Sequence, residues 1–541
     1  MKYITIVLLL MSVMLKAQVA ITIPTEFEKN DKLVLAWAYN NTLDSIISEV
    51  AGIVQQVAEV EIIYNPDSTQ YDTTQIISFL TNIGVDAEGI SFLEIRSNTC
   101  WLKQYSPVMG YGVFDTTLIQ YLGDPYFTAY NQPNNDSIPK KLSELWGKEL
   151  ASYNLEFENT NLQYDGFKNL FIGSNVIEQN IPMDENEVRT NLNAYFASDD
   201  VIFTPYLTHS GGGDIIGNNM YMKMLDFETI LVASIPDTLP DFNLIEDFVT
   251  NLETITNKFG GNYNVIRIPS PPNSNGSYPI ERFDESRSYT DAIIVNNIVL
   301  VPSFGISEFD TAAYQTFKKY MDGYQVYMVD SRSLTMLGGS LGSLALVVPQ
   351  SNLLRIIHEK NIGAQEFRSD YDILCLATSS DLIEEMWLYY RINDDTEYTK
   401  KEIYLVCPQH FGVIEGLTPQ DTVHYYIEAI SSTTTTTYPL SAPNGNFTFW
   451  FDIVNIYTFE TNTTQYSIVP NPSSGDFKIY GSIGTEKIHL SIYNMSGTKL
   501  FDEYTNVGET ISLGKSLKEG YYTVLIVSGD TTERLKLLIV R

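Results

Sequence analysis

Five short segments of the chain hold residues whose types and spacing could support chemistry. These segments span residues 101–107, 161–166, 217–223, 289–296 and 337–343. They contain two acids, Asp165 and Asp291, and a serine, Ser343, that ends a glycine-rich turn. A pair of carboxylates can hold a cation electrostatically, whereas a serine acts as a nucleophile only beside a base.

Histidine and cysteine chemistry has few places in this sequence. The chain has five histidines and three cysteines, with no C-x-x-C pair and no Cys/His metal spacing. It contains neither a G-x-G-x-x-G motif nor a Walker loop, so nucleotide binding has no support. We therefore predict no metal and no cofactor.

Two places outside the five segments could supply catalytic groups. His209 and Asp214 lie on a Gly-rich loop and could form an acid/base pair, or simply an exposed surface turn. Cys100 precedes Trp101 and could be a displaced thiol nucleophile or a buried, free cysteine. Cys375 and Cys407 either form a disulfide or serve as small buried hydrophobes.

The elements that must position these residues alternate between strands and helices over residues 19 to about 360. The strand-like runs include residues 32–37, 60–64, 229–233 and 325–329. The helical patterns include residues 45–59, 74–83, 242–259 and 310–321. Such alternation is typical of an α/β domain. A hairpin pattern at 292–301 argues against a simple parallel, doubly wound sheet.

Two smaller all-β regions follow the α/β region. Residues 366–455 hold short strands separated by turn signals, which predicts an immunoglobulin-like β-sandwich. Residues 456–541 begin another β-rich unit, with a turn cluster at 469–475.

The N-terminus and the charge balance bear on where the protein works. Residues 1–17 combine a basic start, an apolar run and Ala17, which predicts a secretory signal peptide. No later segment is apolar enough to predict a transmembrane helix. The net charge of −33 makes nucleic acid a poor partner and suits a cationic ligand better.

The last 75 or so residues resemble the C-terminal sorting domain of the type IX secretion pathway of Bacteroidetes. The resemblance rests on Pro-Asn-Pro-Ser-x-Gly from Pro470, Tyr-Asn-x-x-Gly from Tyr493, Gly-Tyr-Tyr from Gly520 and the lysine-bearing terminal strand. It implies interaction with the type IX machinery and a secreted or outer-membrane surface protein.

The five segments, in their order, resemble the agmatine deiminase and bacterial peptidylarginine deiminase family. Residues 101–107 look like its W-x-R-D-x-G-P motif, 161–166 like G-G-N-x-x-x-D-G, and 217–223 fall where H-x-D-x-x-x-K belongs. Residues 289–296 look like Y-x-N-x-L-I-x-N, and 337–343 fall on the G-G-x-x-H-C turn. The resemblance covers residues 18–360 and implies a five-bladed pseudosymmetric α/β propeller (pentein-like) with a central active site.

Deimination of a guanidinium group makes fixed demands on these segments. A thiolate attacks the guanidinium carbon, a histidine moves protons, and two carboxylates clamp the planar cation. The family's residues at these places are replaced, in chain order, by Gln104, Gly217, Asn219, Gly342 and Ser343. Asp291 stands in place of the asparagine of the Y-x-N motif, and only Asp165 keeps an acid.

These replacements favour a catalytically inactive, exported member of the family with a binding role. Trp101, Asp165 and Asp291 are the expected ligand contacts, and a guanidino small molecule or an arginine-containing peptide is the expected partner. Two other functions stay open: an active guanidine-group hydrolase that uses relocated residues, and a surface adhesin or scaffold.

Overall fold

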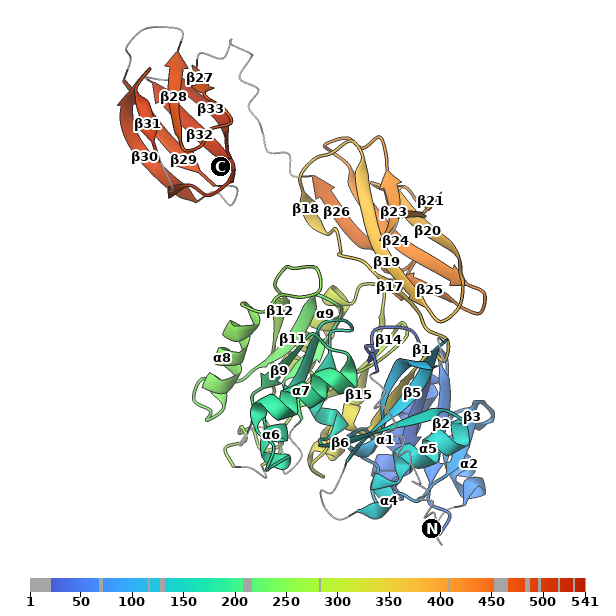
Figure 1. The fold of residues 1–541 in the computed structure, drawn as a ribbon. Helices are drawn as coiled ribbons and strands as arrows, with labels where there is room; N and C mark the ends of the chain where they lie inside the picture. Colours follow the sequence, from blue (N-terminus) through green and yellow to red (C-terminus); the bar gives the residue numbers. More distant parts are fainter. Residues whose placement is uncertain are drawn as a thin grey trace, which may run out of the picture. The chain divides into compact units, whose positions relative to one another are not determined.

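The computed structural model describes twelve stretches of the chain. They are residues 21–67, 72–114, 117–126, 132–207, 217–281, 284–406, 409–451, 466–481, 487–494, 498–513, 516–528 and 531–540. The predicted signal peptide, the His209–Asp214 loop and Cys407 lie outside them. The chain divides after Asp452 into two compact units (Figure 1).

The α/β part of the first unit contains five mixed sheets that repeat one pairing pattern. In each sheet a strand pairs antiparallel with the next strand of its repeat, which then pairs in parallel with a third. Four sheets are β4(Val108–Phe114)-β5(Thr117–Tyr126)-β6(Glu149–Glu156), β7(Leu162–Tyr164)-β8(Asn169–Gly173)-β9(Asp200–Thr204), β10(Met222–Met224)-β11(Thr229–Ser234)-β12(Asn264–Pro269) and β13(Ile293–Val295)-β14(Ile298–Ser303)-β15(Gln325–Asp330). The fifth joins the ends of the region, in the order β16(Ala345–Pro349)-β1(Asn30–Ala36)-β2(Glu59–Tyr64)-β3(Ile90–Glu94).

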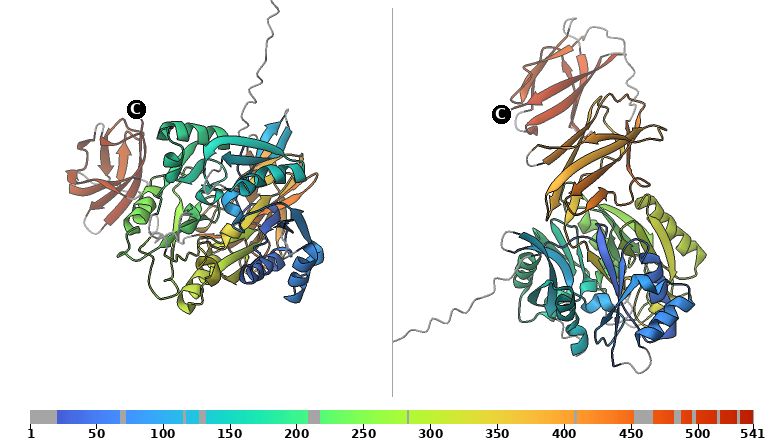
Figure 2. Two further views of the ribbon diagram at one scale, coloured as in Figure 1. Left: turned by 90° about the horizontal axis from the view of Figure 1, so that it is seen from below. Right: turned by 90° about the vertical axis from the view of Figure 1, so that its right-hand side faces the viewer.

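A helix makes the crossover between the parallel strands of every sheet, as parallel pairing requires. These helices are α1(Asn41–Val54), α5(Ile138–Trp146), α7(Glu185–Phe196), α8(Phe242–Leu252) and α9(Ser307–Tyr320). A further helix, α2(Thr73–Asn82), joins β2 to β3. Seen from below, helices lie around the rim of the α/β part (Figure 2). The central strands β8 and β11 are almost wholly buried, which explains their continuous apolar runs.

Local sequence explains where these helices begin and end. Asn40 accepts the backbone N–H groups of Thr42 and Leu43 and so caps α1. Asp184 and Glu187 form a capping box at the start of α7. Helix α8 ends at Leu252, earlier than the predicted residue 259. There Thr254 donates both its N–H and its hydroxyl to the Asn251 carbonyl, which competes with continuation of the helix.

Residues 354–451 form an all-β region of two sheets. One has the order β17(Leu354–Ile357)-β19(Tyr371–Ser379)-β23(Gln409–Ile414)-β22(Tyr404–Val406). The other has the order β18(Gly363–Gln365)-β26(Phe447–Phe451)-β24(Thr422–Ser431)-β20(Ile383–Ile392)-β21(Thr399–Glu402), with β25(Thr435–Tyr438) paired to β24.

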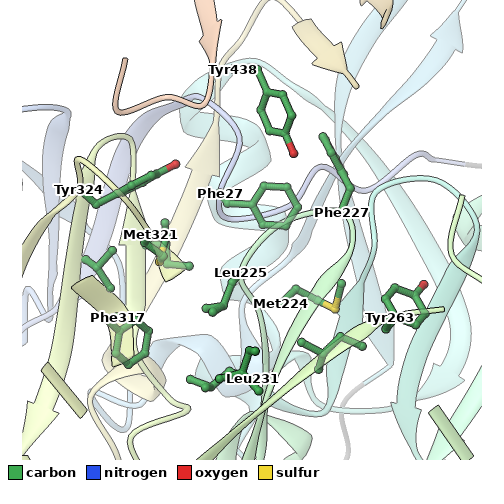
Figure 3. Close-up of a cluster of buried hydrophobic side chains, with 14 of the residues drawn as sticks. Phe27, Met224, Leu225, Phe227, Leu231, Tyr263, Phe317, Met321, Tyr324 and Tyr438 are labelled. Atoms are coloured by element: carbon green, nitrogen blue, oxygen red, sulfur yellow. The ribbon is translucent and has the colours of Figure 1, made fainter. Parts of the chain in front are cut away.

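The all-β region shares one hydrophobic cluster with the α/β part. The Tyr438 ring lies 5.5 Å from that of Phe227, beside Phe27 (Figure 3). Lys360 forms an ion pair of 2.6 Å with Asp226 at the same junction. His358 is buried between the carbonyl of Leu374 and the Tyr425 hydroxyl, at 2.6 and 2.7 Å. The two regions therefore pack as one body.

The second unit is a separate β structure with its own apolar core. Its sheets are β27(Tyr466–Val469)-β28(Asp476–Gly481)-β31(Thr510–Ser512) and β30(Lys499–Asn506)-β29(Lys487–Tyr493)-β32(Gly520–Ser528)-β33(Thr531–Ile539). Within the described residues of the whole chain, no helix has the length and hydropathy needed to cross a membrane.

Candidate functional site

Four short helical turns converge on one narrow pocket in the α/β part. They are α3(Leu102–Tyr105), η3(Asn159–Asn161), η4(Asn218–Met220) and η5(Gly342–Leu344). Each turn directly precedes the first strand of a sheet repeat, namely β4, β7, β10 or β16. The pocket has a volume of about 20 Å³, and its lining includes Trp101, Gln104, Thr160, Asn219, Ser340 and Ser343. The fold thus brings four of the five predicted segments together.

Side-chain amides hold neighbouring turns in register. Asn161 accepts the N–H of Asn218 through Oδ1 at 3.1 Å, which fixes η3 against η4. Gln163 donates to the Met222 carbonyl at 2.7 Å and accepts the Met224 N–H at 3.1 Å. These bonds occupy backbone groups between β7 and β10, so they position Asn219 at the pocket.

Asp291 of the fifth segment, an expected ligand contact, does not itself line the pocket but hydrogen-bonds two residues that do, Ser340 and Ser343. Oδ2 of this fully buried carboxylate accepts hydrogen bonds from the Ser340 hydroxyl and, at 3.1 Å, from the Ser343 N–H. The hydroxyls of Ser340 and Ser343 lie 2.8 Å apart. Ser343 therefore sits in a network of hydroxyls and one carboxylate. No histidine among the described residues lines the pocket, and the group that accepts from the Ser343 hydroxyl is the Asp291 carboxylate, at 3.4 Å.

Neighbouring atoms fill the space beside Gly217 and Gly342, the two glycines expected at the places of family histidines. A Cβ atom on Gly342 would overlap Oδ1 of Asp291. A Cβ atom on Gly217 would overlap the Thr160 carbonyl oxygen and the Asn219 side chain. In the same way the Trp101 ring covers Gly339 so closely that a side chain there would overlap it. The pocket has closed in around these positions.

A partly buried charge cluster lies next to the pocket and borders a second cavity of about 110 Å³, which Asn219 also lines. Glu26 accepts from Lys103 at 2.6 Å and also pairs with Lys223. Burial alone would raise the pKa of Glu26, but the two ammonium groups outweigh it and lower the pKa to about 2. The Lys103 and Lys223 side chains are therefore already engaged with a carboxylate.

Asp165 does not line the pocket. Its Oδ1 accepts three backbone N–H groups, from Phe167, Lys168 and Asn169, at 2.8–3.0 Å. Its Oδ2 accepts the Tyr263 hydroxyl at 2.6 Å. This carboxylate closes the turn between β7 and β8, and its acceptors are occupied.

The structure does not support Cys100 as a displaced thiol nucleophile. Cys100 is buried in an apolar cluster, and that burial raises its pKa to about 12. The thiolate, which is the nucleophilic form, is therefore scarce at neutral pH. Cys375 is likewise a buried free cysteine whose pKa burial raises to about 12. His209 and Asp214 lie outside the described residues.

Sequence reasoning missed Glu26, Thr160 and Ser340. Ser340 lies inside the glycine-rich turn, three residues before Ser343, and its type could have drawn attention. Nothing local distinguishes Glu26 from the other acids of this acidic chain, because its role comes from partners 77 and 197 residues away.

Five mixed sheets, with a polar pocket at the turns before the first strands of four of them, define an α/β protein. Residues 22–349 match the family model described as Porphyromonas-type peptidyl-arginine deiminase. That match covers more than half of the chain, and the chain belongs to this family.

Individual relatives agree with the family assignment. A protein of Legionella pneumophila, named as an agmatine deiminase by assignment only, is 26% identical over 117 residues, which are 21% of this chain and 32% of that protein. The chain thus spans about a third of the length of the curated relatives it matches.

Solved structures share the fold at low identity. The agmatine deiminase of Enterococcus faecalis matches with a TM-score of 0.51 and 16% identity, over 61% of this chain and 96% of that one. An arginine deiminase, so named by assignment, from Porphyromonas gingivalis matches with a TM-score of 0.53 and 16% identity, over 61% and 98%.

The second unit also matches a known domain. Residues 467–541 match the secretion system C-terminal sorting domain. This domain is the type IX signal, so it indicates a secreted or outer-membrane surface protein.

Proposed function

We propose that this protein is an exported member of the deiminase family whose central pocket binds a ligand without converting it. In this proposal the five sheets are the blades of a pseudosymmetric α/β propeller, and the pocket lies at its centre. The all-β region is an immunoglobulin-like module, and the chain begins with a cleaved signal peptide, residues 1–17.

One observation supports the proposal: residues expected at the places of the family's catalytic groups are substituted, and the space beside two of them, Gly217 and Gly342, is filled. Ser343 stands where the thiolate belongs, and an alkoxide is far harder to form than a thiolate. Gly217 and Gly342 have no room for any side chain in the present packing. Gln104 and Asn219 carry no charge with which to clamp a guanidinium.

An active hydrolase with relocated groups is the second candidate. It would need His209 and Asp214 as the acid/base pair, or Cys100 as the nucleophile. The raised pKa of Cys100 and its apolar surroundings weigh against it as a nucleophile. The third candidate is a surface scaffold that binds through the all-β region. Only the exposed sheets of that region support it, and it does not explain the pocket.

The test is an assay of ammonia and ureido product with agmatine, free arginine and an arginine peptide. The chain without residues 1–17 is compared with the agmatine deiminase of Enterococcus faecalis as the positive control. We expect no product from this chain at enzyme concentrations where the control completes the reaction. Measurable turnover would overturn the proposal, and the variants His209→Ala and Cys100→Ala would then locate the catalytic group.

A variant with Gln104→Asp, Asn219→Asp and Ser343→Cys restores three family residues without adding bulk beside the glycines. We expect it to stay inactive, because the proton-moving histidine is still missing. Activity in this variant would show that the pocket needs no histidine at position 217 or 342.

A further inference from the structure

We infer that Asp226, Glu228 and Lys360 form a pH-sensitive latch between the α/β part and the all-β region, tight in mildly acidic solution and looser above neutral pH. The inference does not depend on what the central pocket binds. It comes from the charges and hydrogen bonds that join the β10–β11 turn to the segment between β17 and β18.

Two carboxylates of the β10–β11 turn face one ammonium group across the junction. Lys360 Nζ lies 2.6 Å from Asp226 Oδ2 and 3.7 Å from Glu228 Oε2. The three side chains are between 10% and 18% exposed. The Lys360 backbone N–H also donates to Glu228, at 3.3 Å. When both acids are ionised, the latch therefore carries one net negative charge in a largely buried place, which is unfavourable.

The other groups that the structure places around Glu228 do not correct this imbalance. Asp226 and Glu359 are acids, and their charges oppose ionisation of Glu228. Tyr425 of β24 and Tyr438 of β25 also face it (Figure 3). Burial raises the pKa of both phenols, so both stay neutral and add no positive charge.

The protonation of Glu228 sets the alkaline limit of the latch. Burial raises the pKa of Glu228 from 4.5 to about 7, although Lys360 opposes that effect. A carboxyl whose folded pKa is raised binds its proton more tightly in the folded protein. Its contribution to the stability of the junction is thus fully present below pH 4.5 and is lost as the pH rises through about 7.

His358, two residues before Lys360, sets the acidic limit. Its Nδ1 donates to the Leu374 carbonyl at 2.6 Å, and its Nε2 accepts the Tyr425 hydroxyl at 2.7 Å. That hydroxyl oxygen accepts the Asn361 N–H at 2.9 Å, so its own proton is available for Nε2. The arrangement suits a neutral imidazole. Burial lowers the pKa of His358 from 6.5 to about 4, so its contribution is present above pH 6.5 and is lost as the pH falls through about 4.

Two other polar contacts across the junction are balanced. Arg355 of β17 makes two bonds of 2.6 Å to Glu28, one cation for one acid. Lys29 donates to the Thr434 hydroxyl at 2.9 Å and to the Thr435 carbonyl at 2.6 Å. The shared apolar cluster does not titrate. Loosening above neutral pH should therefore stay local to the latch and should not separate the two regions.

The experiment is amide hydrogen exchange, read by mass spectrometry, on the chain without residues 1–17. Wild type and Glu228→Gln are compared at the same pH, so that the intrinsic pH dependence of exchange cancels. Glutamine has the shape of a protonated glutamate but cannot ionise. In peptides that cover residues 226–229 and 358–361, we expect equal exchange at about pH 5.5. At about pH 8.5 the wild type should exchange at least about tenfold faster.

Glu384→Gln on β20 removes an exposed acid from the all-β region and is the matched control. In the same peptides it should exchange like the wild type at both pH values. Equal exchange of wild type and Glu228→Gln at about pH 8.5 would overturn the latch. A difference spread evenly over the α/β part would overturn it as well, because the effect would then be global.

Asp226→Asn gives a second test, which also decides the question if Glu228→Gln does not fold. It leaves Lys360 to Glu228 alone, so the latch is balanced when Glu228 is ionised. The ratio of wild-type to Asp226→Asn exchange in the two peptides should therefore rise between about pH 5.5 and about pH 8.5. A ratio that does not rise would contradict the inference.

Discussion

Gly217 and Gly342 matter because neighbouring atoms leave no room for a side chain. They are not needed for an unusual backbone conformation, as many turn glycines are. Gly217 has φ −74° and ψ 159°, which any residue can adopt. The Thr160 carbonyl and the Asp291 carboxylate have taken the room beside these two glycines. A histidine introduced at either position would therefore first have to displace the atoms that fill the space there.

We predict that Gly217→Ala destabilises the first unit by about 1–3 kcal/mol, since its methyl group would press on a backbone carbonyl. Gly261→Ala is the matched control, because its Cβ would lie 3.8 Å from the nearest side-chain atom, Nδ2 of Asn257. Urea unfolding followed by tryptophan fluorescence measures both. Equal stability of the two variants would mean that the pocket is looser than described.

Glu26→Gln should cost about 3 kcal/mol at neutral pH, because it leaves Lys103 and Lys223 buried without a carboxylate. The pKa of Glu26 is lowered to about 2 in the folded state, from an ordinary value of 4.5. Its contribution is thus present above pH 4.5 and is lost as the pH falls through about 2.

The measurement is urea unfolding of wild type and Glu26→Gln from pH 7 downward. The stability gap should narrow below about pH 4.5. The exposed Glu149→Gln on β6 serves as control and should show little gap at any pH. A gap that stays constant would contradict the assigned role of Glu26.

At the scale of elements, one rule places the site: a short helical turn stands before the first strand of a repeat. Sequence periodicity predicted most strands and helices near their observed bounds, since apolar runs such as 229–233 are local signals. The motif order predicted which segments meet. It could not predict the hydrogen bond from Asn218 to Asn161 or the position of Glu26, because these depend on packing between distant repeats.

Tyr438→Ala should destabilise the α/β part and the all-β region together, by about 3–5 kcal/mol. The ring packs against Phe227 and Phe447 inside the shared cluster. Tyr438→Phe is the control, and it should be neutral or stabilising because the Tyr438 hydroxyl is buried without a partner among the described residues. Hydrogen exchange in both regions reports the effect, and protection lost only in residues 354–451 would contradict a shared core.

At the scale of the whole molecule, we expect the two compact units to unfold independently of each other. We predict two thermal transitions for the chain without residues 1–17, one for each unit. Ending the chain at residue 452 should remove one transition and leave the other at the same temperature, as calorimetry can show.

Deleting residues 366–455 should instead expose the hydrophobic cluster that the all-β region shares with the α/β part, and should cause aggregation.

The pairing of β1 with β16 joins residues 30–35 to residues 345–349. Pairing two strands over such a sequence separation is slow, because the chain loses the entropy of loop closure before it gains the contact between the strands. The turns at the pocket come from repeats along this whole span, and η5 directly precedes β16. Ligand binding should therefore appear late in refolding, after most of the helical signal has returned. A chain that is unfolded during export would have no affinity for the ligand until β1 pairs with β16.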